Sequence, residues 1–234
     1  MHIGKLYGKH KGQTVYIIGT GPSLRCLPMD FFAGQLTIGI NQAWRHLKTT
    51  YSITVHPELV QEYEASTQKT GTQWIVKKKP PMAHLKLDNP KYYVFHTSYD
   101  VQCVKTRPQD TLYLGEGAQT TAMDMAARMG AKFVCLVGCD AKRLGGDYHA
   151  HDQHVRFVGR TPEDQYRLYR ESTADVRKVL RDLRVSVFTL SPFIGIDAGE
   201  EDYRRLCKEL NLAALPEPKD TSYYTKPAPP PREI

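Results

Sequence analysis

The sequence predicts an α/β domain built on a single doubly wound, mostly parallel sheet. Short apolar runs at 15–18, 36–40 and 132–137 alternate with segments of helical character along the chain. Each of these runs is followed directly by glycine or a polar residue. Strands buried on both faces are continuously apolar, as these runs are, whereas half-exposed strands alternate between apolar and polar residues. The 234 residues suffice for one such domain with a sizeable core.

The first apolar run leads into a glycine-rich turn made of Gly19, Thr20, Gly21, Pro22 and Ser23. Two glycines two positions apart allow a tight turn and the close approach of a ligand. Proline suits the first turn of a helix, and serine offers a hydroxyl beside the free amides. A strand, this turn and a helix start form an anion site, typically for a nucleotide phosphate, although a simple tight turn is the alternative. The third glycine of the dinucleotide fingerprint and the lysine of a P-loop are both missing.

Polar residues also follow other predicted strands. Asn41 comes after the run at 36–40 and is expected either to cap the next helix, at 43–48, or to contact a ligand. Gly138 and Asp140 follow the run at 132–137, where a parallel sheet presents ligand-binding groups. The alternative for Asp140 is a capping role in the next turn. A second glycine- and threonine-rich helix start includes Gln119, Thr120 and Thr121.

Two segments look irregular. Residues 77–110 contain four prolines around one strand-like run at 92–96, and we expect a lid-like insertion there. Residues 141–160 lack periodicity but are rich in polar groups, namely Asp147, Tyr148, His149, His151, Asp152 and His154. The histidine spacing matches no established ligand pattern, so a polar, substrate-facing loop is preferred to a metal site. No metal site is predicted.

The remainder of the chain completes the domain. Thr161 and Pro162 open a long helix that we expect over 165–183, and a last strand follows at 185–190. A closing helix is expected within 197–210. The domain therefore covers 1–213, and the proline-rich tail at 214–234 is expected to be extended or disordered.

Composition restricts the partners and the compartment. The formal net charge of +7 favours anionic partners such as nucleotides, glycans bearing phosphate, nucleic acid or an anionic membrane surface. No apolar run approaches the roughly 20 residues that span a bilayer, and no signal peptide is evident, so a cytoplasmic location is expected. The five cysteines are scattered and odd in number, which favours free thiols.

The order of these motifs resembles a known family. GTGPSL at 19–24, INQ at 40–42, the helix start at 117–121, GCD at 138–140 and LSP at 190–192 follow strands in turn. This series is similar to the glycosyltransferase family 42 sialyltransferases and to the related, partly uncharacterised 6-hydroxymethylpterin diphosphokinase-like proteins. The resemblance covers about 13–195 and implies a Rossmann-like fold of the GT-A-variant type.

The resemblance also implies roles for single residues. The family's first motif contacts a cytidine nucleotide, and here Thr20 replaces its asparagine. Asn41 matches an asparagine that contacts the nucleotide sugar in the family. The helix start at 119–121 matches a Thr-Ser-Gly helix start that lies against the nucleotide phosphates, but it lacks that glycine. Gly138 and Asp140 match the Gly-x-Asp strand end. Tyr148 is the candidate for the loop tyrosine that stabilises the leaving phosphate.

The catalytic base departs from the family pattern. The sialyltransferases carry a histidine just before the helix that leads to the last strand, and counting back places that position near Arg170. Arginine stays protonated and cannot act as a base. The base is therefore expected among His149, His151 and His154, or at Asp140, while Arg170 or Tyr148 would offset charge on the departing phosphate.

The sequence thus predicts a transferase that uses a nucleotide-activated donor, most simply a CMP- or UDP-type nucleotide sugar, with a hydroxyl acceptor. A glycan and a modified phage DNA base are both open as acceptors, and no tightly bound cofactor is expected. One alternative is Mg²⁺- and ATP-dependent pyrophosphoryl transfer to a pterin-like alcohol, with Asp140 and Asp147 or Asp152 as metal ligands. A non-catalytic nucleotide-binding module is the other. Peripheral membrane contact and the oligomeric state stay open.

Overall fold

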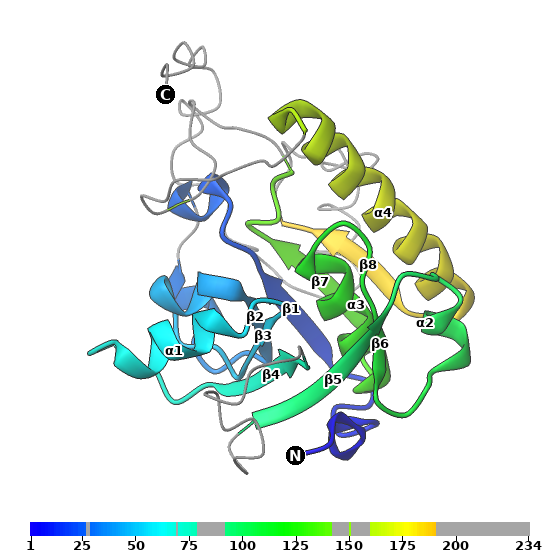
Figure 1. Ribbon diagram of the computed structural model, residues 1–234, viewed down its shortest axis with the longest axis horizontal. Coiled ribbons are helices and arrows are strands. Elements are labelled where there is room, and N and C mark those ends of the chain that lie inside the picture. Colours follow the sequence, from blue (N-terminus) through cyan, green and yellow to red (C-terminus); the bar gives the residue numbers. More distant parts are fainter. Residues whose placement is uncertain (27–28, 69, 79–91, 142–149, 151–159, 191–234) are drawn as a thin grey trace.

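In the computed structural model, eight described strands form one sheet in the order β6-β5-β4-β3-β2-β1-β7-β8, and all the pairings are parallel (Figure 1). The structure describes residues 1–190 except 27–28, 69, 79–91, 142–149 and 151–159. The strands are β1 (Thr14–Ile18), β2 (Thr37–Ile40), β3 (Tyr51–Thr54), β4 (Gln73–Lys77), β5 (Tyr92–Ser98), β6 (Thr111–Tyr113), β7 (Phe133–Val137) and β8 (Ser186–Thr189).

Helices connect these strands. The α-helices are α1 (Glu58–Ala65), α2 (Cys103–Thr106), α3 (Ala118–Arg128) and α4 (Pro162–Asp182). Short 3₁₀ helices are η1 (Ile3–Leu6), η2 (Pro22–Cys26), η3 (Met29–Phe32) and η4 (Asn41–Arg45). None of the helices in the described ranges is long and apolar enough to cross a membrane.

Alternating residues of β1 enter different apolar clusters, which shows that both faces of the sheet are covered. Val15 and Ile17 belong to the larger cluster, which also includes buried residues of α3 and α4. Tyr16 and Ile18 belong to a second cluster, together with residues of η2 and η3. Figure 1 shows α3 and α4 next to each other, and a hydrogen bond joins them. The predicted doubly wound, Rossmann-like sheet is therefore confirmed.

Strand β1 is the point where the winding direction changes. It pairs with β2 on one side and with β7 on the other, and Ile18 lies opposite Val137 at its carboxyl end. Chain segments leaving β1 and β7 pass to opposite faces of the sheet, because η2 contributes to one core cluster and α4 to the other. A crevice for ligands forms outside the strand ends at such a switch point.

The structure corrects several boundaries. Residues 92–98 are not part of an irregular insertion: they form β5, which pairs along β4 from Trp74↔Tyr92 to Lys77↔Phe95. The short helix α2 follows within the same segment. The helix expected at 43–48 is the 3₁₀ helix η4, which begins at Asn41. Residues 142–149 and 151–159, the closing helix at 197–210 and the tail at 214–234 lie outside the described residues.

A buried ion pair attaches α3 to the elements around it. Arg128 Nε donates to Asp124 Oδ1 at 2.8 Å, and both side chains are fully buried. The Tyr113 amide donates to Asp124 Oδ2 at 2.8 Å, while Arg128 Nη2 donates to the Cys103 carbonyl at 3.0 Å. Burial raises the pKa of the Asp124 carboxyl, and the bonds from Arg128 oppose that rise. Periodicity along the sequence does not reveal this network, because its members lie on β6, α2 and α3.

Candidate functional site

The turn at 19–23 packs directly against the end of β7. The Gly19 amide donates to the Val137 carbonyl and the Gly21 amide to the Gly138 carbonyl, both at 2.7 Å. A Cβ added at Gly19 would lie 2.3 Å from the Gly138 oxygen, and one at Gly21 would lie 2.5 Å from Asp140 Cγ. Both glycines are thus required by the neighbouring strand end, a reason that the sequence does not show. Thr20, between them, is partly exposed.

Asp140 fixes the start of η2. Its Oδ2 accepts a bond of 2.6 Å from the Ser23 amide, and its Oδ1 accepts one from the Ser23 hydroxyl. The carboxylate is only 3% exposed. Asp140 therefore caps a turn, as the alternative interpretation proposed, but the turn is the one after β1 rather than the next one along the chain. Pro22 is the first residue of this 3₁₀ helix, as expected.

The end of β7 is tightly packed on its other side too. Gly138 adopts a φ of 62°, and a Cβ there would lie 2.5 Å from Leu24 Cδ2. The adjacent thiol of Cys139 is buried, and burial together with the charge of Asp140 raises its pKa to about 12. Within the described residues, Cys103, Cys135 and Cys139 are free, which confirms the expectation for these three.

Asn41 lies at the end of β2, next to the turn. Its backbone has a φ of 52°, in the left-handed region that asparagine tolerates better than most residues. Thr54 Oγ1 lies 2.9 Å from its Oδ1 and can donate to it, which ties the ends of β2 and β3 together. The capping position of η4 belongs to Ile40, and no side chain caps the helix there. Of the two alternatives for Asn41, the structure excludes the capping role, and the ligand contact stays a prediction.

The amino terminus of α3 is the second predicted anion-binding element. Its capping residue, Gly117, is extended and contributes no side-chain hydrogen bond. Thr120 Oγ1 donates to the Gly117 carbonyl at 2.8 Å and accepts from the Gly115 amide at 3.0 Å. Gln119 Nε2 donates to Thr173 Oγ1 of α4 at 2.9 Å. Two of the three predicted phosphate contacts are thus engaged within the protein.

Thr121 differs from its two neighbours. It is fully buried, and its Oγ1 has no hydrogen-bond partner in the structure. Met125, four residues on and so on the same side of α3, is also fully buried in the large cluster. A buried hydroxyl without a partner costs roughly 1–3 kcal/mol. Among the described residues, Trp44, Thr70 and Trp74 also carry an unpartnered buried polar atom, and the one at Thr121 lies in the helix turn where an anion is expected.

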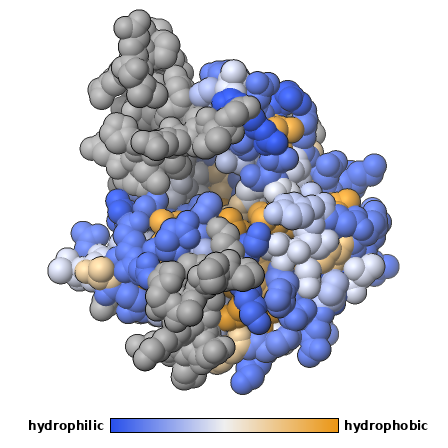
Figure 2. All heavy atoms as spheres, in the orientation of Figure 1, coloured by the Kyte–Doolittle hydropathy of each residue, from blue (hydrophilic) through white to orange (hydrophobic). Residues whose placement is uncertain are grey.

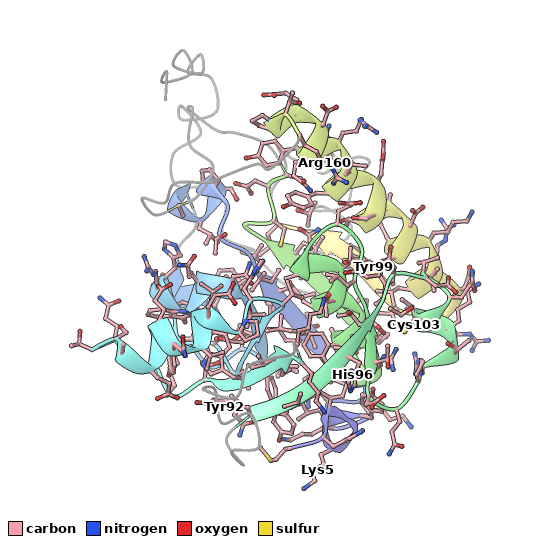
Figure 3. All side chains as sticks on the ribbon, viewed as in Figure 1. Lys5, Tyr92, His96, Tyr99, Cys103 and Arg160 are labelled. Atoms are coloured by element: carbon pink, nitrogen blue, oxygen red, sulfur yellow. The ribbon has the colours of Figure 1, made fainter. Side chains whose placement is uncertain are left out.

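Arginines on and just before α4 complete the region. Arg170 Nη1 donates to the carbonyl of Ala141 at 2.9 Å, directly after Asp140. Ala141 is in the left-handed region, with a φ of 46°. Arg160, labelled in Figure 3, pairs with Glu116 at 2.8 Å, next to the start of α3. Both arginines therefore lie beside the predicted phosphate elements.

The structure shows where Arg170 and Arg160 lie relative to α4. Because α4 begins at Pro162, Arg170 lies well inside the helix, and Arg160 and Thr161 are the residues just before it. The Thr161–Pro162 pattern predicted this helix start.

Several predicted site residues lie outside the described part of the chain. These are the candidates of the loop at 141–160, namely Asp147, Tyr148, His149, His151, Asp152 and His154. In the part of the chain that is described, no group of three or more histidine, cysteine or acidic residues could hold a metal ion. The contacts of the described residues join the turn at 19–23 to Asp140 and Arg170 to Ala141, while Gln119 at the start of α3 contacts α4 and Asn41 contacts Thr54 at the end of β3.

Comparison with known proteins finds distant similarity to solved structures. No family model and no curated protein matches the chain. Among solved structures, the sialyltransferase CstII from Campylobacter jejuni, in complex with the substrate analogue cytidine-5'-monophosphate, matches with a TM-score of 0.39 and 14% identity. The alignment covers 94% of this chain and 95% of CstII. The assignment of the site therefore rests on the chain's own geometry.

Proposed function

We propose that this protein transfers a group from a nucleotide-activated donor, most simply a nucleotide sugar, to an acceptor hydroxyl. The observation that carries the proposal is the switch point between β1 and β7, where the turn at 19–23 meets Gly138 and Asp140. Open α/β sheets bind ligands at this position. Asp140 holds the turn rigidly, so its partly exposed member Thr20 can contact a ligand without a further loss of entropy on binding.

The nucleoside would lie across the ends of β1 and β2. Thr20 is partly exposed in the turn, and Asn41 is partly exposed at the end of the neighbouring strand. The left-handed backbone of Asn41 costs free energy, and strain of this kind concentrates at ligand sites. Thr54 holds the side-chain oxygen of Asn41, which orients its amide.

The phosphates would lie at the amino terminus of α3. The helix dipole and the unpaired amides of a first turn attract anions, and here no side chain caps that turn. Thr121 would supply a hydroxyl that lacks a partner in the present structure. Arg170 and Arg160 would then offset the charge that develops on the departing phosphate.

Chemistry would follow by direct displacement. The acceptor oxygen attacks the anomeric carbon, the bond from that carbon to the phosphate oxygen breaks, and a base takes the acceptor proton. Asp140 accepts bonds from Ser23 with both of its oxygens, so its role is to position the turn rather than to act as the base. We assign the base to the loop at 148–154, at His149 or His151, with Tyr148 beside the leaving group.

A thermal-shift panel of CMP, UDP, GDP, ADP and ATP, with and without Mg²⁺, tests this proposal. A ligand at 100 times its Kd stabilises the native state by about 2.7 kcal/mol. A shift with CMP or UDP that does not need Mg²⁺ is expected. A shift with ATP that requires Mg²⁺ would instead support pyrophosphoryl transfer.

Substitution then locates the site. Asn41→Ala should weaken the thermal shift with the active nucleotide. The control, His96→Ala, changes an exposed residue of β5, which β4 and β3 separate from β2 in the sheet, and should leave the thermal shift unchanged. Activity is measured as nucleotide release from the corresponding nucleotide sugar. The absence of any shift across the panel would contradict the proposal.

A further inference from the structure

The loops at the amino ends of five adjacent strands contain no acidic residue. These are the loops that precede β1, β2, β3, β7 and β8, at 8–13, 33–36, 46–50, 130–132 and 183–185. Their cations are Lys9, Lys11, Lys48, Lys132 and Arg184. We refer to these five loops as the basic edge. In the sequence the lysines are dispersed, and only the sheet order brings them together.

Hydrogen bonds join the basic edge into one surface. The Gly12 amide donates to the Gly130 carbonyl at 2.8 Å, and the Lys132 amide donates to the Gln13 carbonyl at 2.9 Å. On the β8 side, the Ser186 amide donates to the Lys132 carbonyl at 3.1 Å. On the β2 side, the Tyr16 amide of β1 donates to the Leu36 carbonyl at 2.9 Å, and Thr50 Oγ1 lies 3.3 Å from the Gln35 carbonyl, to which it can donate. The loops are therefore neighbours in space, although they lie far apart in the chain.

The cations of the basic edge lie at the surface, and two of them contact aromatic rings: Lys9 Nζ is 5.7 Å from the ring centroid of Tyr51 and Lys132 Nζ is 4.9 Å from that of Phe133. Lys9, Lys11, Lys48, Lys132 and Arg184 are all exposed. Across the described ranges, none of them forms an ion pair with a carboxylate, whereas the exposed Arg167 of α4 pairs with Glu171 at 2.9 Å. Positive charges without carboxylate partners add up to a potential that attracts polyanions.

A polar hollow lies within the basic edge. Its volume is about 480 Å³, and it is lined by Gln13, Thr14, Gly34, Gln35, Leu36 and Thr50. Side-chain amides and hydroxyls are the neutral groups that contact phosphate and sugar oxygens in nucleic-acid complexes. The hollow thus adds hydrogen-bonding capacity on the side of the basic edge formed by the loops before β1, β2 and β3.

We propose that the basic edge binds the phosphate backbone of nucleic acid. A membrane surface is the less suitable partner, because anchoring in a bilayer uses exposed apolar side chains. Among the described residues, Tyr99 is the only large hydrophobic residue that is exposed, and it follows β5 at the opposite, carboxyl edge (Figure 3). The basic edge is separated from the proposed transferase site by the length of β1, roughly 16 Å for five residues. The inference is therefore independent of that proposed function.

The test measures binding of the full chain to a fluorescent 20-base-pair DNA duplex and to a 20-nucleotide single strand between 50 and 200 mM salt. For about four phosphate contacts, the affinity for duplex should fall roughly 100-fold over this range. The double variant Lys11→Gln/Lys132→Gln should bind more weakly and should lower the slope of log K against log salt by about 2. The matched control, Lys78→Gln/Arg167→Gln, removes the same charge elsewhere and should keep the slope of the unsubstituted protein.

Two results would overturn the proposal. The first is the absence of binding to either nucleic acid at 50 mM salt, and the second is an equal loss of DNA affinity in the two double variants. A third arm uses vesicles of phosphatidylcholine with 30% phosphatidylserine. Binding to these vesicles but not to DNA, lost in the Lys11/Lys132 variant, would assign the surface to a membrane instead. Nucleotide thermal shifts of both variants should match those of the unsubstituted protein, so failure here is distinct from failure of the transferase proposal.

Discussion

Asp140, at the end of β7, holds Ser23, 117 residues earlier in the chain, through bonds to both its amide and its hydroxyl. One carboxylate thus satisfies two buried donors of the turn after β1 and joins the two strand ends that border the ligand crevice. The contact explains why an aspartate is needed at the end of β7 without giving it a direct chemical role.

Asp140→Ala should destabilise the fold by about 2–4 kcal/mol, because two buried donors lose an ionised acceptor. Urea denaturation measures the effect. Asp140→Asn keeps the shape and one acceptor oxygen, and should lose about half as much. A double-mutant cycle with Ser23→Ala should show coupling of at least about 0.5 kcal/mol, whereas additive losses would contradict the contact.

Gly19→Ala should cost about 1–3 kcal/mol, because the added Cβ would lie 2.3 Å from the Gly138 oxygen and the backbone must shift. Gly71 provides the matched control. A Cβ there meets nothing within 4 Å, and only its φ of 75° opposes the substitution. Gly71→Ala should therefore cost only about 1 kcal/mol. Equal losses, measured by thermal or urea unfolding, would argue against the close packing of β1 and β7.

Thr121→Val should raise the stability of the ligand-free protein by about 1 kcal/mol, because it removes a buried hydroxyl without a partner while keeping the shape. The same change should reduce the thermal shift produced by the active nucleotide. Thr120→Val is the control, since Thr120 bonds Gly115 and Gly117, and its loss should destabilise the protein by about 1–2 kcal/mol. A Thr121→Val protein that is less stable and binds nucleotide normally would exclude a ligand role for this hydroxyl.

Arg128→Met should destabilise the protein by about 3–5 kcal/mol at pH 8, because it leaves the Asp124 carboxylate buried without its partner. Removal of Arg128 also removes the bonds that hold down the pKa of Asp124, so burial raises that pKa further above its unfolded value.

A carboxyl whose folded pKa is raised favours the folded state at low pH and loses that contribution as pH rises through the folded pKa. The defect of Arg128→Met, relative to the unsubstituted protein, should therefore be smaller at pH 5 than at pH 8. Equilibrium unfolding at both pH values measures this difference. The double variant Asp124→Asn/Arg128→Met should show no such pH dependence, and a defect of equal size at both pH values in the single variant would contradict it.

Local pattern predicted much of the fold. The continuous apolar runs at β1, β2 and β7 and the Thr161–Pro162 helix start gave these elements close to their observed bounds. We did not predict β5 as part of the sheet. A single apolar run with prolines on both sides has the same local pattern whether it lies in a loop or pairs with a neighbouring strand, as β5 does with β4. Asn41 was placed correctly at the strand end, but of its two predicted alternatives the capping role is not observed, and its side chain contacts Thr54 of β3, a neighbour that local pattern does not reveal.

The sequence by itself determined which residues stand at the strand ends, because strand periodicity and glycine-rich turns are local properties of the chain. Only the tertiary structure decided what those residues contact. Asp140 holds Ser23, Arg170 contacts the carbonyl of Ala141, and dispersed lysines share one edge of the sheet. The physical reason is that strand order sets these neighbours, and the order results from packing across the whole sheet rather than from any single segment.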